Sequence, residues 1–281
     1  MLSGIGDPEM LRAQDIPVSV ALPGVGRNLQ DHVSVTVSYA RKEPGPFHAK
    51  MRADRIALEF GRAYFRGKGI AADWPGGVMA FLKSSPKLEL PDVQLLFSAA
   101  PPTARPYLRP FVPPYTDSFG CRAVLLRPES RGHIELASAD PREPVRIRQN
   151  FLATDKDWAT LRAGVRLVRD IGSRQPLASF TTGEISPGAD CRSDAEIDAH
   201  IRATAITVHH PLGTCKMGRA SDPMAVVDPE LKVLGLDGLR VADASVMPDL
   251  VGGNINAPVI MIAEKAADLI RGRPPLAPVN V

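Results

Sequence analysis

The sequence predicts a mixed α/β (α+β) fold in which an antiparallel sheet is packed with helices. Two patterns carry this prediction: segments that alternate apolar and polar residues at a period of two, and segments with a helical period. The chain has 281 residues, 44% of them hydrophobic, which is enough for one large domain or two smaller ones with a core. Its 27 prolines and 23 glycines exclude a helical bundle, because they favour turns and long connections.

The charge balance and the cysteines limit the possible partners. Lys and Arg number 34 and Asp and Glu 31, so the formal net charge is +3, which is too small for a nucleic-acid-binding protein. We therefore expect no nucleic acid partner. The three cysteines are widely spaced and form no CxxC pair, so we expect neither a disulfide framework nor a metal site.

The apolar segments of the chain are short. None reaches the roughly 18 to 20 apolar residues of a membrane span. The first residues also lack the basic region followed by an apolar region that marks a secretion signal. We expect a cytoplasmic protein with no transmembrane segment, and association with a membrane surface stays open.

The first 70 residues contain two predicted helices and two predicted strands. Asp7 as N-cap and Pro8 at the first helical position predict a short helix. Residues 16–22 and 33–39 have the pattern of strands. Residues 41–70 carry eight basic residues and apolar positions at helical spacing, which predicts one amphipathic helix with a solvated basic face.

The middle of the chain has the pattern of an antiparallel sheet. Five segments resemble strands, separated by polar or proline-rich loops: 76–82, 92–99, 122–126, 133–137 and 145–147. The loop at 101–114 holds six prolines and is either a lid over a site or a plain surface connection. Helices are predicted at about 154–172 and after a capping box formed by Ser193 and Glu196.

The last predicted helix, residues 258–271, is apolar almost all round, so we expect it to be buried on more than one face. Small and turn-forming residues precede it at 252–257. They let a ligand approach the helix N-terminus, whose partial positive charge favours an anion.

The Gly-x-Gly pairs near the start are not phosphate-binding loops. Gly24-Val25-Gly26 lacks the third glycine, because position 29 is a leucine, and Gly4-Ile5-Gly6 fails for the same reason. The chain therefore contains no nucleotide-phosphate loop of its own.

Among the six histidines, His210 is the candidate for acid–base chemistry. It is adjacent to His209, so in an extended segment the two side chains point to opposite faces and only one can face a site. Pro211 keeps the backbone of His210 out of the helical region, and the chain then turns. An imidazole on such an elbow suits a general base, although a His-Pro turn taken alone is structural more often than catalytic.

Four ordered motifs, spread over most of the chain, favour a catalytic role of His210 over a structural one. They read LPGVGRNLQDH at 22–32, SRG at 130–132 with LASADP at 136–141, HPLGTCKMG at 210–218, and LRVADASVMP at 239–248 with NINAP at 254–258. Together they resemble the glucose-methanol-choline (GMC) oxidoreductases, the choline dehydrogenase-like FAD enzymes.

The resemblance implies a role for each matching position. His210 would accept the hydroxyl proton of an alcohol while a hydride passes to flavin N5, and Asn254 would hydrogen-bond the substrate oxygen. The backbone of Asn256, Ala257 and Pro258 would face the flavin of FAD.

The same resemblance concerns two further places in the chain. Asp243 and Ala244 would lie near the FAD pyrophosphate, with Asp243 fixing backbone rather than contacting a phosphate. Asp31 and His32 would form a loop that crosses between domains.

The resemblance also implies how the domains are arranged. Residues 1–31 would be part of an FAD-binding domain, 32–205 the substrate-binding domain, 206–275 the histidine loop with the flavin-facing helix, and 276–281 a tail. The fold would then include incomplete portions of a Rossmann-like FAD-binding domain. The family's GxGxxG loop lies in an N-terminal half that this sequence lacks, so we expect that half as a partner. The other expected partner is a small-molecule alcohol, and the formation of a homo-oligomer stays open.

Two functions stay open at this stage. The chain is either the C-terminal part of an FAD-dependent alcohol dehydrogenase or oxidase, inactive when isolated, or a non-catalytic truncated or decayed fragment that acts at most as an interaction module. A choline substrate would need aromatic rings or a carboxylate around its ammonium group, and an apolar primary alcohol is equally compatible. The aromatic candidates are Tyr64, Trp74, Phe97 and Tyr107.

Overall fold

The chain forms two compact units in the computed structural model, which describes residues 1–72 and 76–274. Unit 1 contains three segments of the chain: Met1–His32, Leu126–Asp157 and the segment that begins at Thr207. Unit 2 contains Val33–Leu125 and Trp158–Ile206. Residues 126–157 therefore group with unit 1, whereas we predicted them within the substrate-binding domain. The functional assignment of the domains stays a prediction.

Unit 2 is built on an antiparallel sheet, as the alternating segments predict. Its strand order is β10-β3-β6-β5-β4, and β9 also pairs with β3. The strands are β3 (Val33–Arg41), β4 (Gly76–Leu82), β5 (Val93–Ser98), β6 (Ser118–Leu125), β9 (Thr181–Ser186) and β10 (Ile206–Thr207). The longest register pairs β3 with β6, from Val33 opposite Leu125 to Ala40 opposite Ser118.

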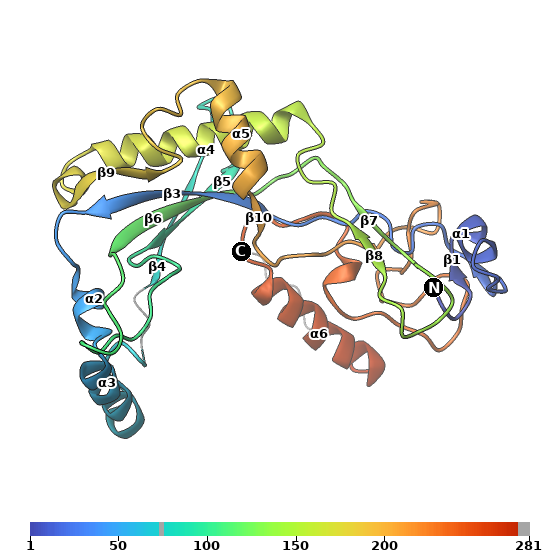
Figure 1. Ribbon diagram of the computed structural model, residues 1–281. Coiled ribbons are helices and arrows are strands. Elements are labelled where there is room, and N and C mark those ends of the chain that lie inside the picture. Colours follow the sequence, from blue (N-terminus) through green and yellow to red (C-terminus); the bar gives the residue numbers. More distant parts are fainter. Residues whose placement is uncertain (73–75, 275–281) are drawn as a thin grey trace. The chain divides into compact units, whose positions relative to one another are not determined.

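Two helices lie on one face of this sheet, α4 (Asp155–Ser173) and α5 (Asp194–Thr204) (Figure 1). Close contact with the sheet depends on Gly164, because a Cβ there would lie 2.9 Å from the Cβ of Ala123. The predicted capping box of α5 is confirmed: the Ser193 side chain accepts from the Glu196 N–H, and Glu196 accepts from the Ser193 N–H over 2.8 Å. A short 3-10 helix spans Leu177–Phe180.

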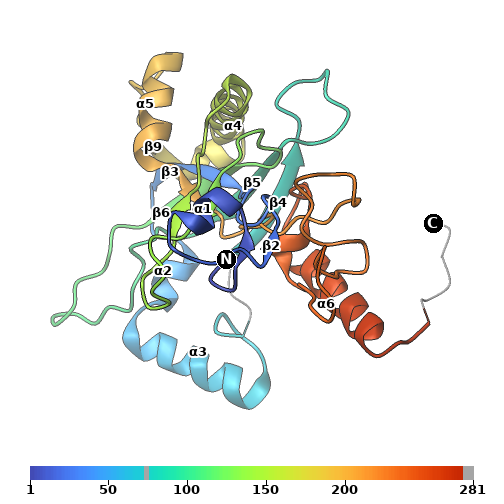
Figure 2. The same cartoon turned by 90° about the vertical axis from the view of Figure 1, so that its right-hand side faces the viewer.

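The single helix predicted over residues 41–70 is wrong. Two helices occur instead, α2 (Pro46–Lys50) and α3 (Ala53–Arg66). The break follows from the backbone of Tyr107, which donates to the Met51 carbonyl over 3.1 Å and accepts from the Ala53 N–H over 2.8 Å. Figure 2 shows α3 lying apart from the sheet. Of the side chains predicted to form its apolar face, Phe60 and Tyr64 are exposed, whereas Ile56 packs on the cluster that contains Phe47.

Unit 1 consists mostly of loops with short regular elements. These are β1 (Ile5–Gly6) paired in parallel with β2 (Val20–Ala21), α1 (Pro8–Arg12), the antiparallel pair β7 (His133–Glu135) and β8 (Arg146–Arg148), a 3-10 helix at Ala244–Val246, and α6 (Asn256–Ile270). Asp7 caps α1 as predicted. The strand predicted over 16–22 is limited to β2, because Ile16 still bonds back to Leu11 at the end of α1.

Helix α6 is buried on one face, not on several as we expected. Ala266 and Ile262 pack on the core of unit 1, a cluster formed by residues such as Val227 and Val246. The other face leaves large apolar side chains exposed, Ile260, Met261 and Ile270. None of the helices within the described ranges is long and apolar enough to cross a membrane.

Candidate functional site

The loop that carries His210 is held by a segment almost 180 residues earlier in the chain. Gln30 and Leu212 exchange two backbone hydrogen bonds, of 3.0 and 2.9 Å. The Val208 N–H donates to the carbonyl of His32 over 2.9 Å. The motifs at 22–32 and 210–218 therefore form one local structure within unit 1.

A glycine closes this structure behind His210. Gly213 has a φ of +93°, and a Cβ there would lie 2.5 Å from the carbonyl oxygen of Asn28. The positive φ and the close approach both require glycine. Gly26 has the same function at φ +83°, where its missing Cβ lets the Ile134 carbonyl approach, so both glycines allow backbone segments to pack closely.

Asp31 fixes the backbone on both sides of the histidine pair. Its carboxylate is buried and accepts from the His210 N–H over 2.9 Å and from the Thr207 hydroxyl. His209 lies between these two residues at a φ of +62° and its side chain is exposed. The ring of His210 thus turns inward, while that of His209 stays in solvent.

The imidazole of His210 contacts a second, fully buried imidazole. Its Nδ1 lies 2.8 Å from Nδ1 of His32, and the rings are 5.1 Å apart at an interplanar angle of 82°. Nε2 of His32 lies 3.1 Å from the carbonyl oxygens of both Leu126 and Val251. All three segments of unit 1 meet at the ring of His32.

The electrostatic surroundings of the two imidazoles favour their neutral forms. Burial, and after it the neighbouring His210, lower the pKa of His32 to about 4, while the hydrogen bonds with the two carbonyls oppose the shift. Burial also lowers the pKa of His210, which Asp31 raises and His209 lowers. At neutral pH both rings are therefore uncharged.

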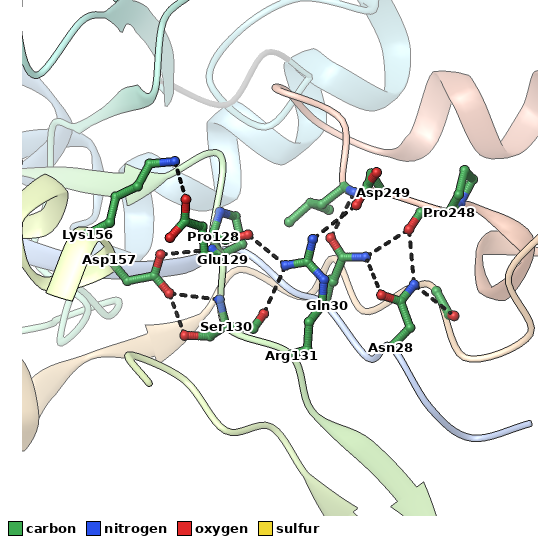
Figure 3. Close-up of polar contacts among 12 residues, drawn as sticks. Asn28, Gln30, Pro128, Glu129, Ser130, Arg131, Lys156, Asp157, Pro248 and Asp249 are labelled. Carbon is green, nitrogen blue, oxygen red and sulfur yellow. Dashed lines mark hydrogen bonds and ion pairs between the residues drawn. The ribbon is translucent and has the colours of Figure 1, made fainter. Parts of the chain in front are cut away.

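Two amides of the first motif hold the segment that follows position 247. The Asn28 and Gln30 side chains both donate to the carbonyl of Pro248, over 3.0 and 3.1 Å (Figure 3). The Gln30 side-chain oxygen accepts from the Leu250 N–H over 3.1 Å. Because Gln30 is almost fully buried, these bonds fix the chain just before Val251, whose carbonyl contacts His32.

The SRG motif at 130–132 forms a polar cluster beside this segment (Figure 3). Asp157 is fully buried and accepts from the N–H groups of Glu129 and Ser130, over 2.9 and 3.1 Å, and from the Ser130 hydroxyl. Arg131 donates to Asp249 over 3.0 Å. The motif therefore organises backbone, and its arginine contacts the residue that follows Pro248.

The predicted flavin-facing residues lie at the start of α6. The helix begins at Asn256, two residues before the expected start at Pro258, and no side chain caps its N-terminus. Asn256 and Ala257 are exposed, and no acidic residue lies in the first turn. Asn254 is exposed on the loop just before the helix, three residues after Val251.

Asp243 fixes local backbone. Its side chain accepts from the Ser245 N–H over 2.8 Å at the start of the 3-10 helix. The carbonyls of this helix accept from the His210 loop: Ala244 from the Gly213 N–H over 3.4 Å, and Ser245 from the Cys215 N–H over 2.9 Å. Asp243 and Ala244 therefore lie beside the loop that carries His210.

Sequence reasoning missed two residues of this site. Asp31 and His32 lie where unit 1 ends and unit 2 begins, at the predicted crossing, and they also hold the backbone and the ring of His210. Because the two histidines are 178 positions apart in the sequence, no local sequence pattern could indicate their contact. The available signal was the motif at 22–32, which ends on two adjacent polar residues directly before the buried strand β3.

Comparison with known proteins places these motifs in a family. The family model of the GMC oxidoreductases matches residues 128–263. The mitochondrial choline dehydrogenase of Mus musculus is 44% identical over 100% of this chain and 46% of the relative. The chain belongs to the GMC oxidoreductase family. Oxygen-dependent choline dehydrogenase 1 of Chromohalobacter salexigens is 42% identical over 99% of this chain and 49% of the relative, so the chain spans about half the length of these curated GMC relatives.

Solved GMC structures share the fold. Pyridoxine 4-oxidase from Mesorbium loti superposes with a TM-score of 0.77 at 30% identity, over 98% of this chain and 49% of that one. Formate oxidase of Aspergillus oryzae RIB40 gives 0.82 at 26% identity, over 96% and 51%. The predicted family and the mixed helix and antiparallel sheet fold are confirmed.

FAD is the cofactor of the GMC relatives, and the residues of this chain fit the flavin end of that molecule. The N-terminus of α6 presents uncapped N–H groups without an acidic neighbour, which suits a ring that becomes anionic on reduction. The sequence has no Gly-x-Gly-x-x-Gly loop for the pyrophosphate. Within the described part of the chain, no group of three ligating side chains could hold a metal ion.

Three of the four aromatic candidates for a choline cage are described by the structure, and each has different surroundings. Tyr64 is 83% exposed on α3, Tyr107 stacks on His48 with ring centroids 5.1 Å apart, and Phe97 packs beside Phe119. Trp74 lies outside the described residues.

The proline-rich segment at 101–114 borders two hollows of unit 2. One hollow, of about 250 Å³, is lined by Pro101, Pro102 and Arg122 among others. The other is lined by residues that include Tyr107 and Pro114. Whether the segment acts as a lid stays open, because a surface connection would border these hollows equally well.

Proposed function

We propose that this chain supplies the acid–base and flavin-facing residues of an FAD-dependent enzyme that oxidises the CH–OH group of an alcohol. The observation that carries this proposal is the imidazole of His210, which is neutral, half-buried and fixed through both its backbone and its ring. Such a group is positioned as a general base.

His210 accepts the proton of the substrate hydroxyl, and Asn254 hydrogen-bonds the substrate oxygen. Asn254 does not titrate, so it orients the alcohol while His210 changes its protonation state. Bound FAD would supply the hydride acceptor. Asn256, Ala257 and Pro258 would hold its flavin ring through the N-terminal N–H groups of α6, and Asp243 and Ala244 would line the approach of its pyrophosphate.

The non-catalytic alternative is not favoured, because the relatives are choline dehydrogenases and oxidases of the GMC family. The similarity to choline dehydrogenases supports choline as the first substrate to test. Unit 2 would provide most of the substrate-binding domain. An FAD-binding half of the family type would be the partner, and a homo-oligomer and a cytoplasmic location stay predictions.

Anaerobic flavin reduction tests the proposal. The chain is produced together with the FAD-binding half of a GMC relative, loaded with FAD and mixed with choline or a primary alkanol, and the bleaching of the flavin is followed. We expect His210→Gln to slow bleaching by roughly 10²- to 10⁴-fold, the usual contribution of a general base. His209→Gln is the matched control, since this adjacent histidine is exposed, and it should bleach at the unsubstituted rate.

Two results would contradict the proposal. One is bleaching in His210→Gln at the rate of the unsubstituted protein. The other is FAD bound by the assembled protein that no alcohol in the panel reduces.

A further inference from the structure

The ring of His32 makes contacts that only one placement of protons satisfies. Its Nε2 lies within hydrogen-bond distance of two carbonyl oxygens, those of Leu126 and Val251. A carbonyl oxygen only accepts, so Nε2 must carry a hydrogen and donate it. The carbonyls of two chain segments therefore fix the tautomer of His32.

The second nitrogen of His32 is then an acceptor. His32 is fully buried, and its lowered pKa keeps the ring neutral at physiological pH, with one hydrogen in all. Since Nε2 holds that hydrogen, Nδ1 presents a lone pair to Nδ1 of His210 at 2.8 Å. Two lone pairs repel at this distance, so Nδ1 of His210 must supply the hydrogen.

We propose that His32 is a positioning residue that fixes His210 in the Nδ1–H tautomer and so leaves Nε2 of His210 as its basic nitrogen. The inference rests on the proposed function and deepens it, because it names the atom that accepts the proton and the group that selects this atom. His210 in the opposite tautomer would present an N–H to the alcohol and could not act as a base.

The arrangement also accounts for the proton after it leaves the alcohol. Nε2 of His210 takes it, Nδ1 keeps its hydrogen, and the ring becomes an imidazolium. The carboxylate of Asp31 favours this charged form and His209 opposes it. His32 does not compete for the proton, because its own pKa lies far below that of an ordinary histidine.

His32 also connects the two residues proposed to contact the substrate. Its Nδ1 holds the ring of His210, and its Nε2 holds the carbonyl of Val251, three residues before Asn254. One buried ring therefore sets the protonation of the base and the position of the loop that carries the orienting amide.

Nitrogen NMR of the chain, without FAD or alcohol, determines which ring nitrogen of His210 carries the hydrogen. Histidine is labelled with ¹⁵N, spectra are recorded near pH 8, and the signals of position 210 are assigned by their loss in His210→Gln. We expect a protonated Nδ1, an unprotonated Nε2, and a scalar coupling between Nδ1 of His210 and Nδ1 of His32 across their hydrogen bond.

Substitution at position 32 separates tautomer control from packing. His32→Phe fills the space without an acceptor, so the His210 signals should shift toward the Nε2–H form and the coupling should vanish. His32→Gln retains an acceptor and a donor and should keep Nδ1 protonated. The matched control is His48→Phe in unit 2, another buried histidine whose Nε2 contacts a carbonyl, and it should leave the His210 signals unchanged.

The results that would overturn this inference differ from the result that would refute the proposed function. Nε2–H on His210 of the unsubstituted chain, or unchanged signals in folded His32→Phe, would overturn the inference. If His32→Phe does not fold, the unsubstituted spectrum and His32→Gln decide. A chain with the expected tautomer that reduces no flavin in the assembled protein would refute the proposed function alone.

Discussion

Two adjacent residues hold one imidazole in two different ways. Asp31 bonds to the backbone of His210, and His32 bonds to its ring. The sequence motif predicts His210 as the base, because a family resemblance can be recognised from short contiguous stretches of sequence. It could not predict the partners of His210, because their contact depends on how distant segments meet in the folded chain.

The buried ring of His32 makes the stability of the chain depend on pH. In the unfolded chain this histidine binds a proton near pH 6.5, whereas in the folded chain it stays neutral down to about pH 4. The unfolded state therefore binds more protons within this window. This contribution to the free energy of unfolding is fully present above pH 6.5 and is lost as the pH falls toward 4.

Denaturant midpoints at pH 7.5, 6 and 5 check this expectation. The decrease toward low pH should be smaller in His32→Gln, because glutamine does not titrate. Equal pH slopes in the two proteins would show that His32 already binds its proton in the folded state.

Asp157 is a second residue whose removal should be costly. It is fully buried and accepts three hydrogen bonds from Glu129 and Ser130. Asp157→Asn places an amide donor against these donors, so we expect a loss of about 1–3 kcal/mol in the free energy of unfolding. Chemical denaturation measures it, and Asp155→Asn, an exposed change on the same helical turn, should cost within about 0.5 kcal/mol.

At the scale of elements, prediction succeeded where local pattern and tertiary pairing agree. The alternating segment at 33–39 became β3, and the capping box at Ser193 opens α5. Prediction failed where tertiary contacts decide. Tyr107 divides the helix expected over 41–70, and β9 was missed because the polar, glycine-containing segment Thr181–Ser186 becomes a strand only by pairing with β3.

Two glycines of α3 should respond to alanine in opposite ways. Gly61 lies inside the helix with open space around its Cα, so Gly61→Ala should raise the free energy of unfolding by about 0.5–1 kcal/mol through helix propensity. Gly67 ends the helix at a φ of +60° with equally open space, so Gly67→Ala should lower it by about 1 kcal/mol through strain alone. Thermal unfolding of both variants tests the signs, and equal signs would contradict the argument.

At the scale of the whole molecule, much apolar surface stays uncovered. Ile260, Met261 and Ile270 are each more than half exposed on α6, and Phe65 is 82% exposed on α3. Monomeric proteins rarely leave apolar patches of this kind in water. We therefore expect the isolated chain to associate with itself.

Size-exclusion chromatography with light scattering checks this expectation. The chain should elute above its monomer mass of 30.2 kDa, and Ile260→Lys with Met261→Lys should shift it toward the monomer without lowering its melting temperature. As a control, Ala266→Lys, on the buried face of the same helix, should lower the melting temperature. A soluble unsubstituted monomer that melts cooperatively would contradict the prediction.

The register of β3 against β6 places His32 next to its carbonyl partner. Val33 pairs with Leu125, so formation of this antiparallel strand pair brings position 32 beside position 126, where the Nε2–carbonyl contact forms. Pairing of these strands closes a loop of more than 90 residues, so the entropy of that closure is not lost a second time when the contact of His32 forms. We therefore expect changes that slow the pairing of β3 with β6 to delay the contact between His32 and the Leu126 carbonyl.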